Sequence, residues 1–105
     1  MQTITVKIGR NVGRVRMHDD DWNFFQSDLR TLMERLGVET SFVGRGFGPW
    51  KDDLMEESFT IVGGLPDETL RPDLVDELSR LAFVYSQEAI DLTIGKTVLV
   101  SALGE

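Results

Sequence analysis

The chain has 105 residues, enough for one domain with a single core and too few for two. Its composition, 41% apolar and 28% charged, is that of an ordinary globular protein. The chain has no cysteine and one histidine, His18. This composition excludes disulfides, thiolate metal sites, cysteine nucleophiles and metal sites with several histidines. The net charge of −7 argues against nucleic-acid binding, which needs a broad basic surface.

The first residues alternate in polarity from Thr3 to Ile8, which predicts a strand with one buried face. This pattern differs from the apolar run of an export signal, and no later run is long enough to span a membrane, so we expect a cytoplasmic protein without a membrane partner. Asn11 and Gly13 are typical turn residues, and alternation resumes from Arg14 to Met17, which predicts either a short hairpin arm or an extended lead into the next element.

A helix is predicted where apolar residues recur at helical spacing from Trp22 to Leu36, with Gly37 following as a C-terminal cap. Three aspartates, 19–21, precede this run, and we expect Asp20 or Asp21 to be the N-cap. Their charges also suit the positive end of the helix dipole. A metal-binding acidic triplet is the alternative, but helix starts commonly have this composition.

The second half predicts strands at 40–43 and 58–62, separated by a long glycine-rich and acidic connection, 44–57. Connections of this length in a compact domain are often functional. A second helix is expected from about Pro72 to about Ser86. Two last strands, at 89–94 and 97–102, are expected on either side of a tight turn at Gly95 and Lys96.

The order β, α, β, β, α, β, β predicts an α+β fold in which an antiparallel sheet carries both helices on one face. Our first choice is a ferredoxin-like split βαβ sandwich that forms a single domain over residues 1–105. The other face of the sheet is left open. Because a second copy often covers such a face in a small domain, we expect a homodimer.

The segment 44–50 is the most distinctive in the chain, because three glycines allow close backbone approach while Arg45 and Trp50 offer charge and a stacking surface. It matches no known phosphate-binding motif, and a structural bulge and turn is the alternative interpretation. We predict a ligand pocket around this segment. Its residues are Arg45, Trp50, Glu57, Gln87, Arg10, Arg14, Arg16 and Tyr85, with no catalytic residue, metal or cofactor.

Glu56 and Glu57 open the strand at 58–62, where successive side chains point to opposite faces of a sheet. They are therefore not expected to act together as an acid/base pair. One of them is expected to form a structural ion pair with Arg45 or with an arginine near the N-terminus.

A set of short motifs resembles a small uncharacterised bacterial domain family: Trp22-x-x-Phe25, Gly44-Arg45-Gly46 followed by Trp50, Glu57-Ser58, and Tyr85-x-Gln87-Glu88. The chain departs from that family in lacking an export signal, in the extra residues between Gly46 and Trp50, and in its more acidic surface. The family has no assigned activity, so the resemblance implies a shared fold and a possible site only.

Three hypotheses of function follow. The first is a non-catalytic protein that binds, and in one version sequesters, an anionic, nucleotide-like metabolite, since cations, an indole and a flexible backbone suit such a ligand. The second is an acidic interaction protein or inhibitor that binds a basic partner through acids such as Asp52 and Asp53, with a phage or mobile element as one option for its source. The third is a small enzyme without metal or cofactor.

Overall fold

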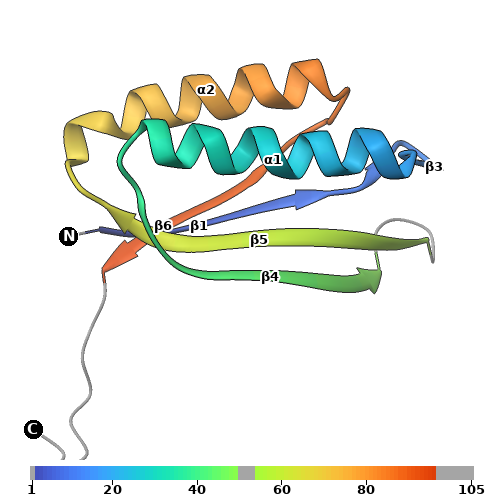
Figure 1. The fold of residues 1–105 in the computed structure, drawn as a ribbon, viewed down its shortest axis with the longest axis horizontal. Coiled ribbons are helices and arrows are strands. Elements are labelled where there is room, and N and C mark those ends of the chain that lie inside the picture. Colours follow the sequence, from blue (N-terminus) through green and yellow to red (C-terminus); the bar gives the residue numbers. More distant parts are fainter. Residues whose placement is uncertain (1, 50–53, 97–105) are drawn as a thin grey trace, which may run out of the picture.

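Four antiparallel strands form one sheet in the order β4-β5-β1-β6 (Figure 1). The computed structural model describes residues 2–49 and 54–96. The strands are β1 (Gln2–Gly9), β4 (Glu39–Pro49), β5 (Met55–Leu65) and β6 (Asp91–Lys96). β1 lies at the centre, paired with β5 on one side and β6 on the other.

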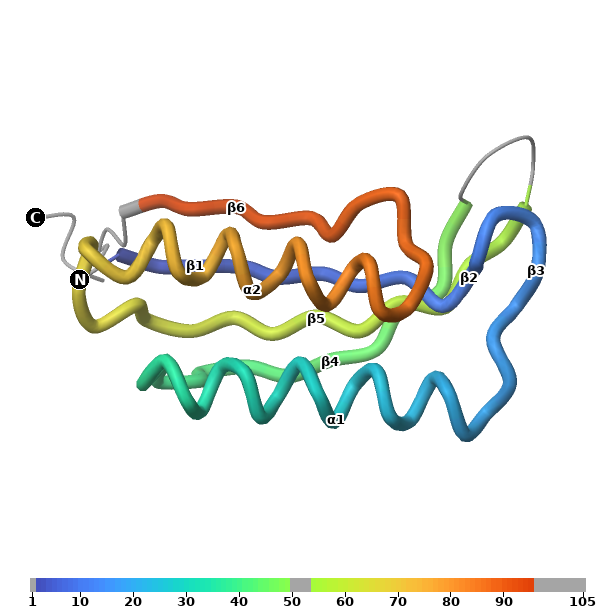
Figure 2. The backbone as a smooth tube through the Cα atoms, turned by 90° about the horizontal axis from the view of Figure 1, so that it is seen from above, coloured from blue at the N-terminus to red at the C-terminus, as the bar shows by residue number. Residues whose placement is uncertain are grey.

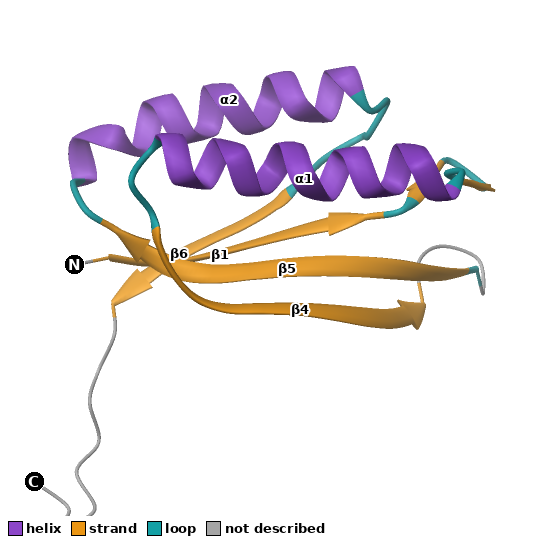
Figure 3. Ribbon diagram, in the orientation of Figure 1, coloured by secondary structure: helices purple, strands orange, loops and turns teal. Residues whose placement is uncertain are grey.

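Both helices cover the same face of this sheet, and the opposite face is open (Figure 3). α1 (Asp19–Arg35) and α2 (Arg71–Val84) lie side by side, and a short 3-10 turn, η1 (Glu68–Leu70), precedes α2. This arrangement confirms the predicted ferredoxin-like α+β fold. None of the helices within residues 2–49 and 54–96 is long and apolar enough to cross a membrane.

A small hairpin extends beyond one end of the sheet (Figure 2). It is formed by β2 (Asn11–Val12) and β3 (Val15–Arg16), and Gly13 in its turn has a φ of 59°. Of the two predicted arrangements for this segment, the hairpin arm is therefore the one present. It connects the end of β1 to the start of α1.

The core lies between the sheet and the helices because the strands alternate. Ile4, Val6 and Ile8 of β1 are all 0–1% exposed and point toward the helices. β5 contributes Phe59, Ile61 and Leu65 in the same way, and α1 and α2 contribute Trp22, Phe25, Leu29, Leu32, Met33, Leu74, Leu78 and Leu81. Burial of these apolar side chains is the main stabilising contribution to the fold.

The ends of α1 confirm one prediction and correct another. Gly37 follows the helix with a φ of 73°, a left-handed conformation that favours glycine. The N-cap is His18, without a capping side-chain hydrogen bond, so the predicted cap at Asp20 or Asp21 is wrong. All three aspartates lie in the first turn instead, where their charges face the positive end of the helix dipole.

The predicted long connection 44–57 is also wrong, because most of it is strand. Residues 44–49 belong to β4 and pair with β5 in continuous register from Gly44↔Thr60 to Pro49↔Met55. A register shift lies between Thr40 and Phe42, and the pairing then continues past the predicted end of the strand at Val43. Glycine usually weakens a strand, but pairing along the whole length of β5 outweighs that local preference.

The predicted turn at Gly95 and Lys96 is a further correction, because both residues belong to β6. They pair with Thr3 and Gln2 of β1. The central strand therefore extends β6 to a point where local sequence indicates a turn. The strand predicted at 97–102 lies outside the described residues.

Candidate functional site

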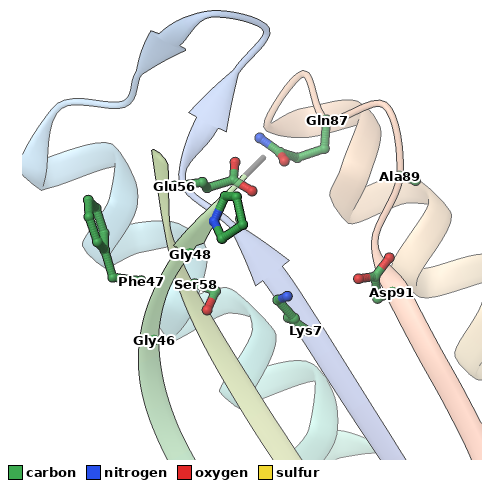
Figure 4. Close-up of a pocket in the computed structure, with 11 residues that line it drawn as sticks. Lys7, Gly46, Phe47, Gly48, Glu56, Ser58, Gln87, Ala89 and Asp91 are labelled. Carbon is green, nitrogen blue, oxygen red and sulfur yellow. The ribbon is translucent and has the colours of Figure 1, made fainter. Parts of the chain in front are cut away.

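A cleft of about 340 Å³ lies on the open face of the sheet, at the end next to the hairpin (Figure 4). The same alternation that buries Ile8 and Phe59 turns Lys7 and Ser58 to this face. Every strand of the sheet contributes to the cleft or adjoins it. The lining consists of Lys7, Gly9, Gly46, Phe47, Gly48, Pro49, Glu56, Ser58, Gln87, Ala89 and Asp91.

Glycines leave part of the cleft floor without side chains. Gly46 and Gly48 of β4 lie on this face, and Gly9 of β1 lies across β5 from them. A Cβ at Gly46 would lie 2.9 Å from Ser58 Oγ, whereas one at Gly48 would meet nothing within 4 Å. A flat ligand group can therefore rest directly on the β4 backbone.

Glu56 is held in the cleft by two features of its surroundings. Its carboxylate lies against Gly9, where a Cβ would come within 2.3 Å of Glu56 Oε1. The backbone N–H of Asn11 donates a 2.8 Å hydrogen bond to Glu56 Oε2. Within residues 2–49 and 54–96, Oε1 receives no hydrogen bond. One oxygen is thus fixed by the hairpin, and the other can contact a ligand.

Gln87 belongs to the connection between α2 and β6, which forms one wall of the cleft. Its Nε2 donates to the carbonyl oxygen of Asn11 at 3.2 Å. Ser86, just before it, has a φ of 54°, a conformation uncommon for residues other than glycine. Asn11 therefore connects both walls, because its N–H binds Glu56 and its C=O binds Gln87.

Tyr85 anchors that connection to α1. Its hydroxyl donates a hydrogen bond to Asp28, and its ring stacks on Phe25 with centroids 4.4 Å apart and planes at 12°. Burial, followed by the nearby Asp28 carboxylate, raises the pKa of Tyr85. Tyr85 is therefore a neutral donor at physiological pH and supports the cleft wall from outside.

The charged side chains in the cleft are Glu56, Asp91 and Lys7. Lys7 and Asp91 stand directly opposite each other on β1 and β6. Figure 4 shows Glu56 near Gln87 at the hairpin end, with Lys7 and Asp91 further along the strands. Two carboxylates and one ammonium make the lining negative overall.

Glu57, adjacent to Glu56 in sequence, points to the helix-covered face and belongs to a separate ion-pair cluster. Arg10, 5% exposed, donates from Nη1 to Glu57 at 3.3 Å, from Nη2 to Asp19, and from Nε to the Met17 carbonyl at 2.9 Å. Arg16 Nη2 contacts Glu57 Oε1 at 2.6 Å. The predicted structural ion pair with an N-terminal arginine is therefore present.

The pKa values in this cluster reflect the pairing. Burial lowers the pKa of Arg10, but hydrogen bonds to Asp19 and Glu57 outweigh burial and raise it above its ordinary value. The hydrogen bond from Arg10 lowers the pKa of Asp19. These ionised groups join the hairpin, β5 and the start of α1.

The predicted ligand residues thus do not form one pocket. Gln87 lines the cleft, while Arg10, Arg16 and Glu57 form the ion-pair cluster on the other face. Arg45 pairs in register with Phe59, on the face opposite Gly46. Arg14 lies in the hairpin turn, Tyr85 contacts Asp28, and Trp50 lies outside the described residues.

Sequence reasoning missed Glu56, Lys7 and Asp91 as site residues. Their signal is weak, since each is one polar residue in an alternating strand and the open face of any sheet has such residues. Only the register brings them together. The two-residue period of a strand predicts that the Glu56 and Glu57 side chains point to opposite faces of the sheet, and the structure confirms it.

No group of three or more potential metal-ligating side chains occurs among the described residues. The homodimer and the acidic-partner surface stay predictions, and Asp52 and Asp53 lie outside the described ranges.

No protein family model matches the chain, and no curated protein matches its sequence. Solved structures share its fold. A phage SAM lyase in the apo state aligns with a TM-score of 0.58 at 18% identity, covering 89% of this chain and 78% of that one. The C-terminal domain of the MgtC protein from Mycobacterium tuberculosis aligns with a TM-score of 0.59 at 11% identity, covering 95% of this chain and 94% of that one. An unknown protein from Galdieria sulphuraria aligns with a TM-score of 0.51 at 12% identity, covering 92% of this chain and 48% of that one. At these identities the likeness shows the fold alone.

Proposed function

We propose that the open-face cleft binds a small nucleoside-type ligand that carries a positive charge, with S-adenosylmethionine as the first candidate. The observation that carries this proposal is the Glu56 carboxylate, seated on Gly9 and fixed by Asn11 with one oxygen open to the cleft. The name of one fold neighbour, a phage SAM lyase, suggests a ligand of this kind.

The charges around the cleft favour a cation over the anionic metabolite predicted from sequence. Arg10 and Arg16 are engaged by Glu57, which leaves Lys7 as the cation in the described lining. A unit charge about 4 Å from a carboxylate gains about 1 to 4 kcal/mol at effective dielectric constants of about 80 to 20. An anion would be repelled by Glu56 and Asp91, because their carboxylates carry the same negative charge.

The size and shape of the cleft suit a ligand of that class. Its volume of about 340 Å³ falls at the lower end of the range typical of small-molecule sites. The Gly46 and Gly48 backbone forms a flat surface for a ring system. Glu56, Asp91 and Lys7 supply the few placed polar groups that orient a ligand.

A lyase acting on the same ligand is the second candidate function. The observation that favours it is the unengaged Oε1 of Glu56 within the described chain, because such an oxygen can accept a proton or stabilise a cationic centre during bond cleavage. In such an elimination the carboxylate takes a proton from the carbon next to the one bonded to sulfur, a C=C bond forms, and the C–S bond breaks with its electron pair leaving on sulfur as a neutral thioether. A binding protein would leave that bond intact.

Isothermal titration calorimetry with S-adenosylmethionine tests the proposal, and chromatography of the same mixture shows whether the ligand is cleaved. We expect binding by the intact protein and at least ten-fold weaker binding by Glu56→Gln, which keeps the shape and removes the charge.

Glu57→Gln is the matched control for this experiment. It changes the same charge one residue away, on the other face, and should lower stability while leaving affinity within about two-fold. Failure of the intact protein to bind S-adenosylmethionine, together with binding of an anionic nucleotide, would return the anionic-ligand hypothesis to first place.

A further inference from the structure

Lys7 and Asp91 form an opposite-charge pair whose members do not bind each other. They are direct cross-strand partners on the open face, a position in which Cβ atoms lie about 4.5 to 5.5 Å apart. In the described part of the chain, neither side chain takes part in an ion pair or hydrogen bond. Figure 4 shows both on the cleft side of their strands.

The ion-pair cluster on the other face provides a contrast within the same molecule. There Arg10 and Arg16 both contact Glu57 at 2.6 to 3.3 Å, so those charges are already satisfied. In the cleft, Lys7 retains all three N–H donors and Asp91 all its acceptor sites for a ligand. An adjacent ammonium and carboxylate match the two charges of an α-amino acid, the ligand's carboxylate facing Lys7 and its ammonium facing Asp91.

The position of Glu56 relative to this pair extends the match. Glu56 lies over Gly9, the next residue after Lys7 on the same face of β1. Two residues along a strand span about 6.6 to 6.8 Å. The cleft therefore presents a site for a zwitterion and, one strand repeat away, a carboxylate for another positive charge.

We infer that Lys7 and Asp91 bind the amino acid group of the ligand, so that the cleft selects a nucleoside joined to an α-amino acid. This inference rests on the proposed function and specifies its substrate class. Lys7 pairs with the ligand carboxylate, Asp91 pairs with the ligand ammonium, and Glu56 faces the additional cationic centre. Nucleosides that lack the amino acid group lose two of these three contacts.

Calorimetry with three probes separates the contacts: S-adenosylmethionine, its decarboxylated form, and S-adenosylhomocysteine, which keeps the amino acid group but has a neutral sulfur. Lys7→Met should weaken S-adenosylmethionine binding about ten-fold and change the affinity for the decarboxylated form less than two-fold. Asp91→Asn should weaken binding of all three probes, because each has the ammonium.

Asp73→Asn is the matched control for Asp91→Asn, because it removes the same negative charge from α2, away from the cleft. It should leave all three affinities unchanged. Lys7 and Asp91 are exposed, so we expect the variants to keep the melting temperature of the intact protein, which circular dichroism would confirm.

The outcomes distinguish this inference from the proposed function. Equal affinity of the intact protein for S-adenosylmethionine and its decarboxylated form, with binding still dependent on Glu56, overturns the amino acid site and leaves the cationic-ligand proposal standing. An equal loss for both probes in Lys7→Met overturns it as well. Binding of no probe by the intact, folded protein overturns both proposals.

Discussion

The two faces of the sheet use the same strands for different purposes. In β5, Phe59 is 1% exposed beneath the helices, while Ser58 faces the cleft on the other side. Glu57 and Glu56 divide in the same way, one into ion pairs with arginines and the other toward the cleft. Adjacent residues of one strand thus differ in role because successive side chains point to opposite faces.

This comparison shows where stability and binding can be changed separately. The covered face holds the apolar core and satisfied charges, so substitutions there should lower the free energy of unfolding. The open face has glycines and exposed polar groups with few contacts to lose. Substitutions on it should alter binding at nearly constant stability.

The largest expected effect is on the covered face. Phe59→Ala removes a ring that is 1% exposed in the core and should lower the free energy of unfolding by about 3 to 5 kcal/mol. Ser58→Ala, one residue away on the open face, should change it by less than about 0.5 kcal/mol. Urea denaturation measures both. Equal losses would contradict the division of the sheet into two faces.

Breaking the ion-pair cluster should have the next largest effect. Arg10→Met keeps much of the side-chain volume but removes the hydrogen bonds to Met17, Glu57 and Asp19. We expect a loss of about 2 kcal/mol in the free energy of unfolding, because the buried Met17 carbonyl loses its donor and Glu57 loses a counter-charge. A neutral result would mean that the cluster contributes nothing to stability.

The pH dependence of the same cluster gives an independent test. Arg10 lowers the pKa of Asp19 in the folded protein, so the pair stabilises the fold above the ordinary carboxyl pKa of about 4 and this contribution is lost as pH falls through the lowered value. The stability difference between the intact protein and Asp19→Asn should therefore be constant from about pH 6 to 7 and shrink on acidification below about 4. A difference that stays constant below that pH would exclude the pair as its cause.

Tyr85→Phe should have a smaller effect, because the stack on Phe25 remains and only the hydrogen bond to Asp28 is lost. We expect a loss of about 0.5 to 1.5 kcal/mol at neutral pH. Because the pKa of Tyr85 is raised in the fold, its contribution is complete below about pH 10, the ordinary tyrosine pKa, and is lost as pH rises through the raised value. The denaturation curves of the two proteins should therefore differ at neutral pH and approach each other as the pH rises above about 10.

The smallest effect on stability is expected from Gly9→Ala, which should nonetheless impair binding. The new methyl group would occupy the position of the Glu56 carboxylate, a flexible side chain that can move away. Affinity for S-adenosylmethionine should fall about as far as in Glu56→Gln, by about ten-fold. Gly95→Ala, where a methyl meets nothing within 4 Å, is the control. Normal binding by Gly9→Ala would show that the seat of Glu56 on Gly9 is unimportant.

The sequence by itself determined the fold class, the helix positions and the separation of Glu56 from Glu57. These follow from local periodicity: period two assigns the faces of β1 and β5, and helical spacing with Gly37 places α1. Local patterns suffice for these features because each strand or helix must carry its apolar residues on one face to bury them in the core.

Only the tertiary structure decided that β4 continues through Pro49 and β6 through Lys96, and which side chains share the cleft. Local preference indicated a loop at 44–49 and a turn at Gly95, but pairing with long neighbouring strands made both segments strand. Lys7, Asp91 and Glu56 come from three different strands, so their meeting depends on register. Register arises from contacts between residues far apart in sequence, which no local pattern specifies.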